Sequence, residues 1–141
     1  MSEQMGGDRL RDSFARQSLM TTLGAQMLSH SPGRCQLAAP ILPGMRQQHG
    51  AGHAGVTFAL GDTAAGYAAL SMMPEGREVM TAEMKINLMS PALGERLLAT
   101  GEVVRAGRRL VVVRAEVAAE RAGERVTVAI LQGTMIPVDP P

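Results

Sequence analysis

Hydrophobic and polar residues alternate along the second half of the chain. From position 78 to position 88, one face of the alternating run carries Met80, Ala82, Met84, Ile86 and Leu88. This spacing predicts a β-strand over 78–88, and similar runs predict strands over 95–105, 109–119 and 125–136. Only short turns that contain glycine separate the last three strands. A parallel crossover needs a dozen or more residues, so we expect these strands to be antiparallel neighbours.

The first half of the chain has a helical period instead. Four apolar residues share one face of an amphipathic helix predicted over 8–23, and they are Leu10, Phe14, Leu19 and Leu23. Asp8 is placed to cap this helix. We expect a turn over 29–33 and a strand over 34–41 to follow.

A longer apolar run begins at His53 and continues to Met73, where Pro74 ends it. A helix that is apolar on every side is covered on every side, which predicts a central helix against the sheet. The element order therefore predicts a two-layer α+β fold. We divide it into an N-terminal helical extension over 1–32 and the main domain over 33–141.

Composition narrows the class of protein. The chain has 141 residues, of which 45% are hydrophobic, enough for one domain with a real core. Its net charge is +1 and it has no long basic run, which argues against nucleic-acid binding. The single Cys35 rules out an internal disulfide and is expected to be a plain thiol.

We expect neither an export segment nor a membrane span in the chain. No basic region followed by an apolar one begins it, so we expect no signal peptide and a cytoplasmic location. The apolar run over 55–73 is long enough to be mistaken for a membrane span. Asp62 near its middle would cost about 2.5–3.5 kcal/mol on insertion, so we expect no membrane association.

The glycine-rich loop before the long helix admits several interpretations. Positions 50–55 match G-x-G-x-x-G, but a dinucleotide site needs a preceding strand and a parallel unit, which are missing here. His49 and His53 have a spacing that zinc uses on helices, yet the glycines between them oppose a helix. We therefore expect no metal and no cofactor. A simple helix cap and a carbonyl-binding set of free backbone N–H groups both stay open.

Asp62 is the one acid in the apolar run. It is either satisfied by hydrogen bonds within the fold, or it acts as a base or nucleophile on an ester. Asp62 lies eight residues after Ala54, about 12 Å along a helix axis. One small carbonyl cannot touch both ends of that distance. A site that uses both groups therefore requires a symmetric dimer with two shared sites.

The element order and this loop–helix segment resemble the hotdog fold, and within it the acyl-CoA thioesterases of the phenylacetate-degradation (PaaI-like) type. The resemblance covers about residues 33–137. The family's His-Gly-Gly, with an acid nine residues after the His, corresponds to His53-Ala54-Gly55 and Asp62. The strand over 80–91, which ends in Ser-Pro, is also similar. The resemblance implies one antiparallel sheet of five to six strands around a long central helix, with an N-terminal helix.

The resemblance also implies roles for residues. Asp62 would be the general base or nucleophile on the thioester, and the N–H of Ala54 in the partner subunit would polarise its carbonyl. Gln47 would orient the nucleophile or water, Thr81 would position the water, and His53 would support the loop. The implied assembly is a homodimer with shared sites that pairs into a homotetramer as a dimer of dimers.

Two positions depart from the family pattern. Ala54 replaces a glycine, which keeps the N–H but adds a methyl group where the substrate approaches, and it would be strained at a positive φ. Thr81 has the opposite parity to Met80 and Met84. If the methionine face packs on the helix, Thr81 points away from Asp62 unless the strand bulges.

The resemblance thus implies hydrolysis of an aryl- or medium-chain acyl-CoA. Gly55 and Phe58 are expected near the acyl group. Three residues near the Gly107 turn are candidates for the CoA phosphates, and they are Arg105, Arg108 and Arg109. Two alternatives stay open: a non-catalytic acyl-CoA-binding protein, and an enoyl-CoA hydratase or dehydratase that pairs His49 or His53 with an acid.

Overall fold

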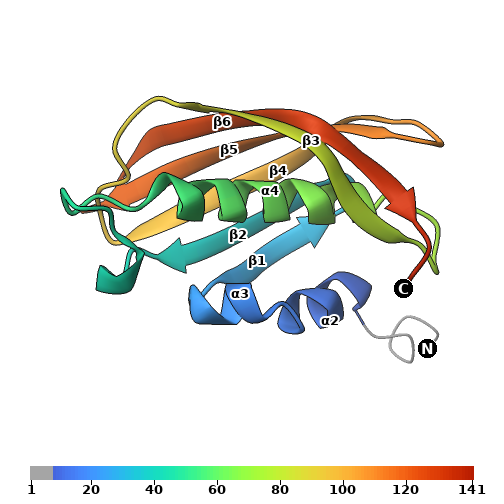
Figure 1. Ribbon diagram of the computed structural model, residues 1–141, viewed down its shortest axis with the longest axis horizontal. Coiled ribbons are helices and arrows are strands. Elements are labelled where there is room, and N and C mark those ends of the chain that lie inside the picture. Colours follow the sequence, from blue (N-terminus) through green and yellow to red (C-terminus); the bar gives the residue numbers. More distant parts are fainter. Residues whose placement is uncertain (1–7) are drawn as a thin grey trace.

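The computed structural model describes residues 8–141, and a six-stranded antiparallel sheet curls around one long helix, α4 (Ala54–Leu70) (Figure 1). The strand order is β1-β2-β4-β5-β6-β3. This is the predicted α+β architecture. The expectation of no signal peptide rests largely on residues 1–7, which lie outside the described part of the chain.

Helix α4 is nearly buried because the sheet wraps it. Ten of its residues are buried, among them Leu60, Ala64 and Leu70. Small side chains let the sheet come close: a Cβ on Gly101 of β4 (Arg96–Ala106) would overlap the backbone of Ala64. The helix ends at Leu70, capped by Ser71, three residues before the predicted end. No helix within 8–141 is long and apolar enough to cross a membrane.

The N-terminal segment differs from the expectation in two ways. The predicted single helix is two short helices, α2 (Arg9–Ala15) and α3 (Ser18–Thr22), because Gln17 between them has an extended backbone. The break rotates the second helix, so that Met20 is buried and Leu19 is 52% exposed. The prediction of Leu19 on the buried face was therefore wrong.

The predicted turn over 29–33 is confirmed at Pro32 and Gly33 and was wrong over 29–31. Residues 29–31 belong to β1 (Gln26–Ser31), which pairs with β2 (Arg34–Pro40) through a hairpin closed by Gly33 at φ +78°. The sequence did not predict β1, because this edge strand is mostly exposed and its two serines and one histidine give no alternation of apolar and polar residues. The division of the chain into an N-terminal extension over 1–32 and a main domain over 33–141 stays a prediction. β1, which lies before residue 33, is part of the sheet.

The later strands lie close to the predicted ranges. They are β3 (Glu78–Leu88), β4, β5 (Val111–Arg121) and β6 (Glu124–Val138). In β3 the pairing with β6 shifts between Thr81 and Glu83. This bulge changes which parity faces the helix, so Val79 lies inward before it, and Met84 and Ile86 pack on the core after it.

The prediction of one continuous apolar face along β3 was therefore wrong at Met80, which is 52% exposed. Leu88 at the end of the strand is 53% exposed as well. A bulge inserts one unpaired residue and reverses the facing of every residue beyond it. Thr81 was expected to point toward the helix only if the strand bulged, and the strand does bulge at this place.

Arg9 fastens the N-terminal helices to the end of α4. Its guanidinium donates to the carbonyl oxygens of Leu70, Met73 and Pro74. The last carbonyls of a helix have no partner within the helix and carry partial negative charge, so a cation there is stabilising. Helix α2 is thereby held against α4.

We predict that Arg9→Ala lowers the free energy of unfolding by about 1–2 kcal/mol, because it leaves three carbonyls without a charged donor. Urea unfolding followed by circular dichroism measures the change. Arg16→Ala is the control, since Arg16 is exposed at the end of α2. Equal midpoints for Arg9→Ala and the wild type would contradict the assignment.

Candidate active site

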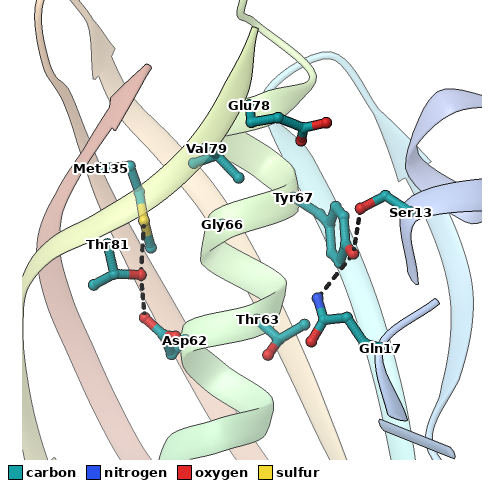
Figure 2. A pocket seen from close by; sticks show the side chains of 10 residues that line it. All are labelled: Ser13, Gln17, Asp62, Thr63, Gly66, Tyr67, Glu78, Val79, Thr81 and Met135. Carbon is teal, nitrogen blue, oxygen red and sulfur yellow. Dashed lines mark hydrogen bonds between the residues drawn. The ribbon is translucent and has the colours of Figure 1, made fainter. Parts of the chain in front are cut away.

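Asp62 lies midway along α4 and faces β3. The Thr81 hydroxyl donates a hydrogen bond to Asp62 Oδ1 at 2.8 Å (Figure 2). Thr81 Oγ1 is also 3.2 Å from the sulfur of Met135, a fully buried residue of β6. The bulge in β3 makes this contact possible, because without it Thr81 would point to the other face.

The surroundings of Asp62 shift its proton affinity. Burial raises the pKa of the Asp62 carboxyl above its ordinary value of 3.8, and the hydrogen bond from Thr81 opposes this in part. Burial disfavours the charged form, whereas a donor to the carboxylate favours it. A carboxylate with a raised pKa is a better base than a solvated one, and perturbed groups of this kind are enriched at functional sites.

A pocket of about 210 Å³ opens beside Asp62, and we call it the Asp62 pocket. Its lining comes from the N-terminal helices, α4 and the two strands β3 and β6: Ser13, Gln17, Asp62, Thr63, Gly66, Tyr67, Glu78, Val79, Thr81 and Met135. Ser13 and Gln17 were missed, because they are ordinary polar positions in a short helical segment and only the tertiary fold brings them to the pocket.

The start of α4 is built around His53. His53 caps the helix, and its Nδ1 accepts the N–H of Gly55 at 2.8 Å. A Cβ on Gly55 would lie 3.0 Å from this nitrogen, which explains the glycine. Within residues 8–141, no acceptor lies in hydrogen-bonding range of the Ala54 N–H. Ala54 has a helical backbone, so the expected strain of a positive φ is absent.

Gln47 stabilises the loop before the helix. Its side-chain oxygen accepts the backbone N–H groups of His49 at 2.6 Å and Ala51 at 3.3 Å. Gln47 and Ala54 both line a second pocket of about 360 Å³, the helix-start pocket. Thr57 lines it too and has a buried hydroxyl without a hydrogen-bond partner among the described residues. Sequence reasoning did not single out Thr57.

The two pockets share no lining residue. Asp62 and Thr81 belong to one, whereas Ala54 and Gln47 belong to the other. This agrees with the spacing of about 12 Å that eight helical residues impose. One protomer therefore brings together Asp62 with Thr81, and separately His53, Ala54 and Gln47, but it does not join the two groups.

The remaining candidates lie elsewhere. Phe58 is half-buried against the core and lines neither pocket. Three exposed arginines sit at the turn between β4 and β5, at the end of the sheet away from the start of α4 (Figure 1), and they are Arg105, Arg108 and Arg109. Their role toward a ligand stays a prediction.

Comparison with known proteins adds independent support. The model of the thioesterase superfamily matches residues 49–126. A Deinococcus radiodurans protein named "Putative esterase" is 31% identical over 119 residues, which are 84% of this chain and 77% of that protein.

Two solved structures are similar over most of the chain. A thioesterase family protein from Silicibacter pomeroyi is 44% identical with a TM-score of 0.91, and the match covers 93% of this chain and 96% of that one. The E. coli PaaI protein from the phenylacetic acid degradation operon is 23% identical with a TM-score of 0.82, over 91% and 89% of the two chains, and supports the fold. The chain therefore belongs to the thioesterase superfamily, has the hotdog fold of its PaaI-like members, and is a thioester hydrolase.

Proposed function

We propose that the protein hydrolyses an aryl- or medium-chain acyl-CoA, in a homodimer whose two sites each combine Asp62 of one protomer with Ala54 of the other. The observation that carries this proposal is the half-buried Asp62 carboxylate, which accepts a hydrogen bond from Thr81 beside a pocket. Hydrolysis of a thioester by these groups needs neither a metal nor a cofactor.

In the proposed reaction, Asp62 removes a proton from water, or attacks the thioester carbonyl itself. Either route places negative charge on the carbonyl oxygen. The C–S bond then breaks, and CoA leaves as the thiol with the proton that water has given up. In the second route, that water hydrolyses the anhydride between the acyl group and Asp62. The unpaired N–H of Ala54 at a helix start is suited to stabilise that charge, since the helix dipole is positive there. Thr81 fixes the orientation of Asp62, and His53 and Gln47 hold the loop that presents Ala54.

The proposed dimer is supported by the edge of the sheet. β3 is an edge strand of eleven residues. Three large apolar residues near it are more than half exposed, and they are Met80 at 52%, Leu88 at 53% and Met89 at 57%. Edge strands with apolar side chains are templates for pairing with another chain. A copy related by twofold symmetry would pair at this edge, and two such dimers would form the expected tetramer.

The alternative of a hydratase is less well supported by the geometry. That chemistry pairs an acid with a histidine for proton transfer. In His53 the ring nitrogen Nδ1 already accepts the N–H of Gly55 and caps α4, so this nitrogen is not free for proton transfer. The arginines at the β4–β5 turn are proposed to contact the CoA phosphates.

We predict that Asp62→Asn lowers thiol release from acyl-CoA by at least about a hundredfold, because the amide can neither accept the proton nor attack the carbonyl. A thiol-release assay over short, aromatic and longer acyl groups measures this. Size-exclusion chromatography should show an unchanged oligomer. Turnover near that of the wild type in the variant would refute the role of Asp62.

The same substitution should stabilise the fold at neutral pH. The pKa of Asp62 is raised in the folded protein, so the unfavourable charged form is present above the folded pKa and absent below the unfolded value near 3.8. Asp62→Asn removes this cost. We expect a higher melting temperature than the wild type at pH 7 and a smaller difference at pH 3. A difference that grows as the pH falls would contradict the assigned direction.

Complementation between inactive protomers tests the shared site. Ala54→Pro removes the N–H at the first helical position, where proline is tolerated, and the extended His53 before it suits a proline. We expect Ala54→Pro and Asp62→Asn to be inactive alone. Co-expressed, they should recover about a quarter of wild-type activity, since half of the dimers each contain one intact site. No recovery in isolated mixed dimers would place both groups in one protomer.

A further inference from the structure

Helix α4 contains three glycines, which is costly because glycine in a helix interior is less favourable than alanine. Packing explains two of them. The ring of His53 covers Gly55, and a Cβ on Gly61 would lie 2.9 Å from Leu131 and 3.1 Å from Val117. A Cβ on Gly66 would meet only Met135 Cε, at an ordinary 3.9 Å. The contacts around it therefore give no reason for glycine at position 66.

Gly66 lines the Asp62 pocket. Figure 2 shows it on α4 between two groups of side chains, with Asp62 and Thr81 on one side and Tyr67 with Gln17 on the other. Because a Cβ there would touch so little of the protein, it would stand in the open space of the pocket. The missing side chain keeps a passage across the helix from Asp62 to Tyr67.

On the side of this passage away from Asp62, Tyr67 is held in place by several contacts. The Tyr67 hydroxyl is 2.9 Å from Ser13 Oγ and accepts a hydrogen bond from Gln17 Nε2 at 2.8 Å. The ring of Tyr67 is 3% exposed and meets Phe14 edge to face, with centroids 6.1 Å apart. These contacts join α2 and α3 to α4 and close the pocket opposite Asp62.

We propose that Gly66 is a specificity-determining residue: the acyl group of the thioester lies over it, with its distal end against Ser13, Gln17 and Tyr67. This rests on the proposed function of Asp62. A cavity of roughly 150 Å³ holds a benzene ring, so the pocket of about 210 Å³ fits one aromatic ring or a short chain. The described lining residues include the carboxylates of Asp62 and Glu78 and no basic side chain, which disfavours a negatively charged acyl group.

Gly66→Ala tests this with little risk to folding, since alanine is the better helix former and the new Cβ meets no close neighbour. We expect kcat/KM for benzoyl-CoA to fall about tenfold or more relative to acetyl-CoA, the size of effect that one extra methyl group produces in a pocket. The melting temperature should not fall. Gly61→Ala is the matched control: its Cβ meets Leu131, so the melting temperature should fall while the benzoyl-to-acetyl ratio stays unchanged.

Binding separates this inference from the proposed reaction. Calorimetry with non-hydrolysable thioether analogues of benzoyl-CoA and acetyl-CoA should show that Gly66→Ala weakens only the benzoyl analogue. If the wild type releases no thiol from any acyl-CoA but this binding difference is seen, the proposed function fails and the acyl pocket stands. If Gly66→Ala changes neither the turnover ratio nor the binding ratio, the inference is overturned.

Discussion

The close approach of one apolar helix to a curved sheet governs the rest of this structure. Gly101 of β4 lies against the backbone of Ala64, where any side chain would overlap it. Small residues along α4 repeat this closeness at Gly61, against Leu131 and Val117. Because the sheet covers the helix so tightly, a polar side chain on α4 loses part of its contact with water. Asp62 is half-buried for this reason, and that burial raises the pKa of its carboxyl.

A tightly covered helix leaves few places where such an acid can find a partner. The bulge in β3 supplies one, because it turns Thr81 toward the helix and gives Asp62 Oδ1 a donor at 2.8 Å. The same bulge moves Met80 outward to 52% exposure, on an edge strand whose backbone is open to pairing. One local irregularity thus serves both the proposed site and the proposed contact between subunits.

Much of this could be predicted from the sequence, and the failures have physical causes. The strands with clear alternation and the long apolar helix were predicted to within a few residues, because their periodicity records burial directly. Asp62 stood out because a lone acid in an apolar run needs a partner. β1 could not be predicted, since an exposed edge strand has no apolar alternation. The break at Gln17 was missed as well, because glutamine is an ordinary helix residue and gives no local signal of a break. Ser13 and Gln17 reach the Asp62 pocket through tertiary contacts with Tyr67, and the place of Gly66 in the same pocket also depends on the tertiary fold, which no local pattern encodes.

The separation of the two pockets has a consequence for the protein as an enzyme. A rigid helix fixes the distance from its first N–H to a carboxylate eight residues later, so no side-chain motion within one protomer brings Ala54 and Asp62 to one carbonyl. Catalysis that uses both groups must then depend on association. In the dimer proposed above, the packing at the β3 edge is therefore as necessary to the reaction as either residue. Thr57 lines the helix-start pocket together with Ala54. Its buried hydroxyl at the helix-start pocket has no hydrogen-bond partner among residues 8–141. A buried polar group left unpaired is costly, so this end of the protomer has most to gain from a neighbouring chain or a ligand.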